Sequence, residues 1–248
     1  MSVSRRRFVA SSLGVVASGL LGGAAQASGG AAPARHHEVI GHSRHGRPID
    51  AYRLGPADAP SRFVVLGQIH GDELGGWYVV RKYLMDAAAP AGVQVWLIPT
   101  MNPDGRVAGT RTNARGVDLN RNFAASTWKR QDKGTPTWSG PHPASEPETR
   151  AMQRFLTREH PYTVVSMHQP FAVVDFSGGD PRVTRWLSRH LGLPARRIGT
   201  DGGNMTTWVN ENWRRHTAVT LELPLPASEH FQRKTARVLL NLSAHRAP

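Results

Sequence analysis

Two histidines and a glutamate of this sequence stand close to the ends of short apolar runs, where they could hold a divalent metal ion. His70 and Glu73 follow the run at residues 62–66 and are three positions apart, so one helical turn can bring their side chains together. His168 ends a second apolar run. Two histidines and one glutamate with an open fourth position are the ligand set of hydrolytic zinc sites. Because the chain has no cysteine, a metal would have to bind His, Asp or Glu.

A further glutamate could act as the base of such a site. Glu222 follows the apolar run at residues 218–221. A zinc ion lowers the pKa of its bound water to about 7, and a nearby base then takes the proton. Taken singly, each residue has a more ordinary explanation, such as a packed histidine or a Glu222–arginine ion pair. Their joint placement at strand ends is typical of sites at the carboxyl edge of an α/β sheet.

The elements that must position these side chains alternate along the chain. Its 248 residues, with 39% hydrophobic residues, suit one globular domain. The patterns predict strands at 37–43, 48–54, 62–66, 93–98, 162–167 and 218–223, and helices at 73–87, 146–159, 181–191 and 229–244. Ser145 is predicted to cap the second helix. Alternating strands and helices predict an α/β domain with a mostly parallel sheet.

The interval at residues 101–143 is too long and too rich in Gly, Asn, Arg and Pro for a simple connection, so we expect it to be functional. Its motifs NPDG and GVDLNRNF occur in order with HGDE, SMH and TLELP elsewhere in the chain. Together these five motifs resemble the zinc carboxypeptidase family, and within it the compact bacterial branch of murein peptide amidases. The resemblance implies a single α/β domain with a mixed, mostly parallel twisted sheet and helices on both faces.

The resemblance also assigns roles at the metal. The zinc ligands would be His70, Glu73 and His168, holding one Zn²⁺ per chain, and Glu222 would be the general base and acid. Arg111 matches the arginine that polarises the scissile carbonyl. Asn120 and Arg121 match the pair that grips the terminal carboxylate of the substrate, a role that suits the planar fork of an arginine.

The implied substrate is a small peptide derived from the cell wall. Hydrolysis of its γ-D-glutamyl–meso-diaminopimelate bond would release the terminal diaminopimelate. Two other hydrolytic functions stay open: a general metallocarboxypeptidase acting on ordinary peptides, and an N-deacylase of the aspartoacylase or succinylglutamate desuccinylase type. The NPDG turn and Arg111 favour a peptidase over the deacylase.

The sequence departs from the family pattern at one place. Many members supply a tyrosine over the substrate from the stretch between the third zinc ligand and the catalytic glutamate. The tyrosines of this chain are Tyr52, Tyr78, Tyr83 and Tyr162, so that stretch has none. Its equivalent, residues 199–208 (GTDGGNMTTW), offers threonine and tryptophan instead.

The first residues are typical of an export signal. A start containing Arg5-Arg6-Arg7-Phe8, a weakly apolar middle and a closing Ala25-Gln26-Ala27 predict a twin-arginine-type signal peptide at 1–27. The middle is too short and too rich in glycine for a membrane span of about 20 strongly apolar residues. We therefore expect a flexible leader at 28–35, a catalytic domain at 36–248, export to the periplasm or secretion, and no stable membrane insertion after signal removal.

The chain is strongly basic, which raises the possibility of anionic partners. Its 31 Lys+Arg and 18 Asp+Glu give a formal net charge of +13. A non-catalytic protein that binds an anionic envelope polymer or nucleic acid is therefore an alternative. The cations are mostly arginines spread along the chain, and no nucleic-acid-binding module is present, so we expect no nucleic-acid partner.

Overall fold

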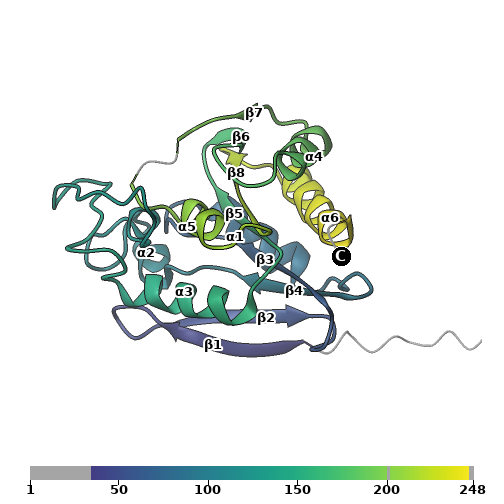
Figure 1. Ribbon diagram of the computed structural model, residues 1–248, viewed down its shortest axis with the longest axis horizontal. Helices are drawn as coiled ribbons and strands as arrows, with labels where there is room; N and C mark the ends of the chain where they lie inside the picture. Colours follow the sequence, from purple (N-terminus) through teal and green to yellow (C-terminus); the bar gives the residue numbers. More distant parts are fainter. Residues whose placement is uncertain (1–34, 200–201, 246–248) are drawn as a thin grey trace, which may run out of the picture. The chain divides into compact units, whose positions relative to one another are not determined.

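Eight strands form one mixed sheet in the computed structural model, which describes residues 35–199 and 202–245 (Figure 1). The strands are β1 (His36–His42), β2 (Pro48–Leu54), β3 (Ser61–Leu66), β4 (Val93–Ile98), β5 (Thr163–His168), β6 (Phe171–Asp175), β7 (Ala195–Arg196) and β8 (Thr217–Pro224). Their order across the sheet is β1-β2-β4-β3-β5-β8-β6-β7. The central pairs β4–β3, β3–β5 and β5–β8 are parallel. The predicted signal peptide and nearly all of the predicted leader lie outside the described residues.

The central strands are covered on both faces. Along β3, Phe63 and Val65 belong to one hydrophobic cluster, whereas Val64 and Leu66 belong to a second. Every residue of β4 and β5 is buried. Near-continuous apolar runs are typical of parallel strands that are buried on both sides, because each face must pack against helices.

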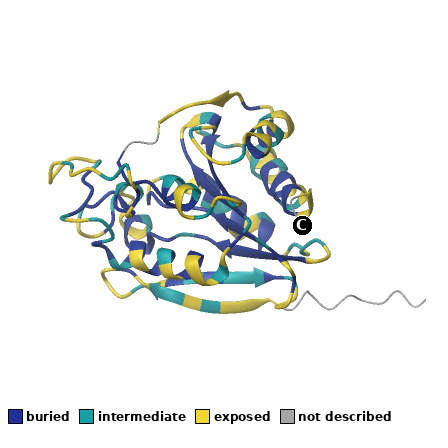
Figure 2. Ribbon diagram, viewed as in Figure 1, coloured by how far each residue is buried: buried dark blue, intermediate teal, exposed yellow. Residues whose placement is uncertain are grey.

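The helical elements divide between the two faces. They are α1 (Leu74–Tyr78), the π-helical segment η1 (Val79–Leu84), α2 (Pro103–Ala108), the 3₁₀ turn η2 (Leu119–Arg121), α3 (Pro147–Glu159), α4 (Pro181–Leu191), α5 (Met205–Asn212) and α6 (Glu229–His245). Buried residues of η1, α4 and α6 contribute to one cluster, and those of α3 and α5 to the other. Figure 2 shows the central strands buried and the helices exposed along their outer sides. The predicted fold class is confirmed.

Several local predictions differ from the structure. The helix expected at 73–87 is a short α1 followed by η1, and it begins at Leu74 with Glu73 as its N-cap. The N-cap of α3 is Glu146 and not Ser145, whose hydroxyl instead donates to the Glu146 carboxylate at 2.8 Å. The NPDG turn opens α2, because the Asn102 side chain accepts from Gly105 N and caps the helix. None of the described helices is long and apolar enough to cross a membrane.

Candidate active site and metal centre

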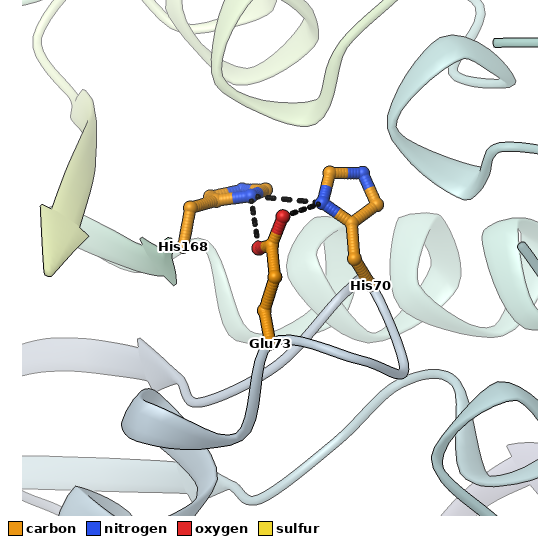
Figure 3. Close-up of side chains that lie close together, drawn as sticks. All are labelled: His70, Glu73 and His168. Carbon is orange, nitrogen blue, oxygen red and sulfur yellow. Dashed lines mark hydrogen bonds and ion pairs between the residues drawn. The ribbon is translucent and has the colours of Figure 1, made fainter. Parts of the chain in front are cut away.

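His70, Glu73 and His168 converge at the carboxyl edge of the sheet (Figure 3). His70 lies in the loop that follows β3, Glu73 is at the start of α1, and His168 is the last residue of β5. The parallel pairing of β3 with β5 brings these ends together. His70 Nδ1 lies 2.7 Å from Glu73 Oε1 and 3.2 Å from His168 Nδ1, which is 3.1 Å from Glu73 Oε2. The three predicted ligands therefore present their donor atoms to one point.

This spacing fits a zinc ion. Zinc–nitrogen bonds of about 2.0–2.1 Å in a tetrahedron place two ligand atoms about 3.3 Å apart, close to the 3.2 Å between the two Nδ1 atoms. When bound here, zinc supplies a Lewis acid and lowers the pKa of water. The electrostatics agree: although burial favours the neutral imidazole, Asp118 and Glu73 raise the pKa of His70 to about 9. The surroundings thus favour positive charge at this point.

A buried aspartate, Asp118, holds both a metal ligand and an arginine in place. Its Oδ1 lies 3.1 Å from His70 Nε2, the ring nitrogen that points away from the metal position. Its Oδ2 accepts from Arg111 Nε at 3.1 Å and Nη2 at 2.9 Å. Burial disfavours the charged carboxylate, but the charges of His70 and Arg111 hold the pKa of Asp118 well below its ordinary value. Carboxylates in this position fix the tautomer and orientation of a metal-binding histidine.

Glu222 lies beside the triad on the neighbouring strand. In the parallel register of β5 and β8 it stands directly opposite His168. Burial raises the pKa of Glu222, and the Glu73 carboxylate adds to this, while His168 acts in the opposite direction. A raised pKa moves a carboxylate toward the range in which it accepts and returns protons near neutral pH. Among the described residues, no arginine forms an ion pair with the Glu222 carboxylate. The more ordinary explanation, a Glu222–arginine ion pair, is therefore not supported.

A cavity of about 320 Å³ opens next to the triad. Its wall contains six of the residues singled out from the sequence: His70, Glu73, Arg111, Asn120, Arg121 and Glu222. Arg111 Nη1 lies 3.5 Å from Glu73 Oε1, which places the guanidinium next to the metal ligands. Asn120 Oδ1 accepts from Met205 N at 3.1 Å, so its amide nitrogen is left to donate. The structure thus brings these side chains to one cavity, while their catalytic and binding roles stay predictions.

Sequence similarity identifies the family of this site. The sequence pattern described as zinc carboxypeptidase matches residues 30–179, which include all three metal ligands. The chain belongs to the zinc carboxypeptidase family. It is 31% identical to murein peptide amidase A of Escherichia coli (strain K12) over 223 residues, covering 83% of this chain and 88% of that protein. It is 33% identical to murein peptide amidase A of Vibrio campbellii over 205 residues, covering 74% and 77%.

Solved structures of the zinc carboxypeptidase family have the same fold. The murein-tripeptide amidase MpaA from Escherichia coli O157 superposes with a TM-score of 0.70 at 29% identity, covering 84% of this chain and 91% of that one. Carboxypeptidase A from Helicoverpa armigera gives a TM-score of 0.72 at 18% identity, covering 87% and 69%, a similarity of fold alone. The protein is therefore a zinc carboxypeptidase, a hydrolase whose His70, Glu73 and His168 form the site for one zinc ion.

Two residues of the stretch that lacks the family tyrosine, Thr206 and Trp208, lie in different environments. Thr206 lines the cavity, so it is available to the substrate. Trp208 is buried in the core, with its ring 6.0 Å from that of Phe123 and 5.3 Å from that of Trp213. The tryptophan is therefore a packing residue, and positions 200 and 201 lie outside the described residues.

Residues that the sequence interpretation passed over also shape the site. Asp118 lies within the GVDLNRNF motif, which was a signal that this position matters. Gln169 follows the third ligand and its backbone N–H donates to Glu73 Oε2 at 3.2 Å. Asp175 lines the same cavity, and nothing in its local sequence marks it.

Proposed function

We propose that this zinc carboxypeptidase hydrolyses the γ-D-glutamyl–meso-diaminopimelate bond of murein peptides and releases meso-diaminopimelate. The observation that carries the proposal is the similarity to murein peptide amidase A, which extends over 88% of that protein.

The residues around the cavity suit the chemistry of this reaction. Glu222 would take a proton from the attacking water and deliver it to the leaving amine. Arg111, held by Asp118, would donate hydrogen bonds to the oxygen of the scissile carbonyl as negative charge develops there. Arg121 and Asn120 would bind the free carboxylate of the released residue, with the Arg121 Nη1 atom braced on the Asn120 carbonyl at 2.9 Å.

We also propose that the protein acts in the periplasm. The support is the amino-terminal sequence, with Arg5 and Arg6 before a weakly apolar stretch and the small-residue site at Ala25 to Ala27. Export would put the enzyme beside the wall peptides. Replacing both arginines by lysine should leave the precursor in the cytoplasm, and unchanged export of that variant would contradict a twin-arginine route.

A general carboxypeptidase on ordinary peptides is the nearest alternative, because the same zinc ligands and base would serve it. Purified protein should be incubated with L-Ala-γ-D-Glu-meso-diaminopimelate and, separately, with hippuryl amino acids, and the products followed by mass spectrometry. We expect the murein tripeptide to be the better substrate. Turnover of the hippuryl substrates alone would refute the murein proposal, and release of an acyl acid from acyl amino acids would revive the deacylase.

The role of Glu222 is tested in the same assay. The Glu222→Gln variant keeps the shape of the side chain but loses the basic carboxylate, so kcat should fall by about 10²- to 10⁴-fold. Zinc content should stay at one ion per chain, because Glu222 is not among the three ligands. A fully active Glu222→Gln protein would mean that another group carries the proton.

A further inference from the structure

Of the three carboxylates in the cavity wall, Glu73, Asp175 and Glu222, only Asp175 has no part in the reaction described above. Asp175 ends β6, which runs antiparallel to β8 with Val173 opposite Glu222. Because side chains two residues apart point to the same face of a strand, Asp175 lies on the face that also presents Thr220 and Glu222. All three of these polar residues line the cavity. Asp175 is only 7% exposed, so its carboxylate lies inside the wall and not on its rim.

The hydrogen bonds of Asp175 use one of its two oxygens. Oδ1 accepts from the backbone and hydroxyl of Ser177, at 2.9 Å and 2.5 Å, and from Ile198 N at 3.2 Å. Among the described residues no donor contacts Oδ2. A carboxylate has about four acceptor positions, so, as far as residues 35–199 and 202–245 are concerned, Oδ2 is left to accept from a ligand.

The two arginines of the cavity wall form hydrogen bonds with groups other than Asp175. Arg111 donates to Asp118, and Arg121 is braced on the backbone of Asn120. Within residues 35–199 and 202–245, neither guanidinium forms an ion pair with Asp175. Three hydrogen bonds stabilise the carboxylate at Oδ1, whereas at Oδ2 a cation can bind without displacing any described donor. The substrate can supply such a cation.

We infer that Asp175 binds the side-chain ammonium group of the residue that the enzyme releases. This inference rests on the proposed function, in which the reaction places that residue in the cavity beside Arg121 and Asn120. Diaminopimelate carries such an ammonium group at its second amino-acid centre. Asp175 would then bind the ammonium group and Arg121 the free carboxylate of the same released residue. This makes Asp175 a specificity-determining residue.

A purely structural role for Asp175 has to be separated from this one. Its Oδ1 ties residues 196–199, which carry the cavity-lining Ile198 and Gly199, to the end of β6. The Asp175→Asn variant keeps an amide oxygen for the three donors, removes the charge and replaces the second oxygen by an NH2 group, which cannot accept from an ammonium group. Ser177→Ala is the matched control, since it removes one of those donors from the wall and leaves the Asp175 charge intact.

The test compares two tripeptides that end either in meso-diaminopimelate or in 2-aminopimelate, which keeps the distal carboxylate but lacks the second amine. Hydrogen bonds to charged groups change such ratios by roughly 10- to 100-fold. We expect wild-type kcat/KM to favour the amine by this factor and Asp175→Asn to lose most of that preference. Ser177→Ala should retain it. Circular dichroism and zinc content report whether each variant is folded and loaded.

The outcomes for the inference and for the proposed function are distinguishable. An Asp175→Asn protein that cleaves both tripeptides with the wild-type ratio overturns the role of Asp175, although the murein activity stands. If wild-type protein cleaves neither tripeptide, hippuryl-lysine and hippuryl-norleucine form the substitute pair. A lysine preference that disappears in Asp175→Asn would then uphold the cation site while refuting the murein substrate, and equal rates on that pair would refute the cation site.

Discussion

Removal of the Asp118 carboxylate should weaken zinc binding although Asp118 is not a ligand. In Asp118→Ala, the His70 Nε2–H group loses its acceptor at 3.1 Å, and the imidazole is free to rotate or to change tautomer. Loss of such a partner typically lowers metal affinity 10- to 100-fold, or about 1.4 to 2.7 kcal/mol. The backbone N–H of Asn120, which donates to the same Oδ1 at 2.8 Å, also loses its partner.

The loss of fold stability can be worked out from the same contacts. A buried donor without an acceptor costs about 1 to 3 kcal/mol. The His70 donor is buried and the Asn120 donor is partly buried, so we expect the apo protein to lose up to about 6 kcal/mol. Arg111 adds little, because its side chain is 30% exposed and can turn to water. Asp118→Asn retains an acceptor oxygen for His70 and should lie between the wild type and Asp118→Ala.

Competition with a chromogenic chelator measures the zinc Kd, and urea unfolding measures the stability. Glu146→Ala is the matched control, because Glu146 is a fully buried carboxylate with its own donors, Asn113 and Arg115, and does not line the cavity. This control should lose stability at unchanged zinc Kd. An Asp118→Ala protein with the zinc Kd of the wild type would refute the coupling between Asp118 and the metal ligand.

Two further predictions concern the scaffold. In Gly71→Ala the new Cβ would lie 2.0 Å from the backbone carbon of Gly105, so the loop that carries His70 must move away from α2. We expect the free energy of unfolding in urea to fall by at least about 2 kcal/mol, and the variant to contain less zinc. An unchanged urea midpoint would show that the His70 loop and α2 can move apart without loss of stability. Burial raises the pKa of Glu148 above its ordinary 4.5, so the folded state favours the protonated form and loses stability as the pH rises through that higher pKa. Urea unfolding between pH 4 and 7 should therefore show wild-type stability falling relative to Glu148→Gln, and a constant difference would contradict the shift.

The elements that the sequence predicted best are those with strong local boundaries. The strands at 48–54 and 93–98 and the helix at 181–191 have the predicted limits. Pro48 opens the first of these elements, and Pro181 and Gly192 bracket the last. Packing in the folded protein leaves the limits of these elements unchanged, because their apolar residues already lie on the face that becomes buried.

The elements that were missed include β6, which depends on contacts distant in the chain, and α5, whose local signals conflict. β6 is five residues long, begins with an exposed Phe171, and exists because it pairs with β8. α5 does have a capping signal, since the Asn204 side chain accepts from Thr207 N at 2.7 Å. The adjacent Gly202 and Gly203 favour a loop, and they concealed that signal.

The residues of the site likewise divide into those that local sequence signals reveal and those that depend on long-range contacts. Strand ends are visible in a sequence, so the sequence alone places His70, His168 and Glu222 at one edge of the sheet. The parts played by Asp118 and Asp175 could not be predicted from spacing, because each depends on donors that other segments bring to its oxygens.

Gln169 gives the site a property that bears on how new specificities could arise. Its side chain accepts from Gly75 N at 2.7 Å and donates to the Pro224 carbonyl at 2.8 Å, so a single amide clamps the helix after Glu73 to the strand that carries Glu222. This bridge adds to the β5–β8 strand pairing, which places Glu222 opposite His168. Mutations of the cavity-lining Phe171, Ile198 and Gly199 can change which substrates the enzyme accepts without removing either hydrogen bond of Gln169, which makes these positions suitable targets for directed evolution.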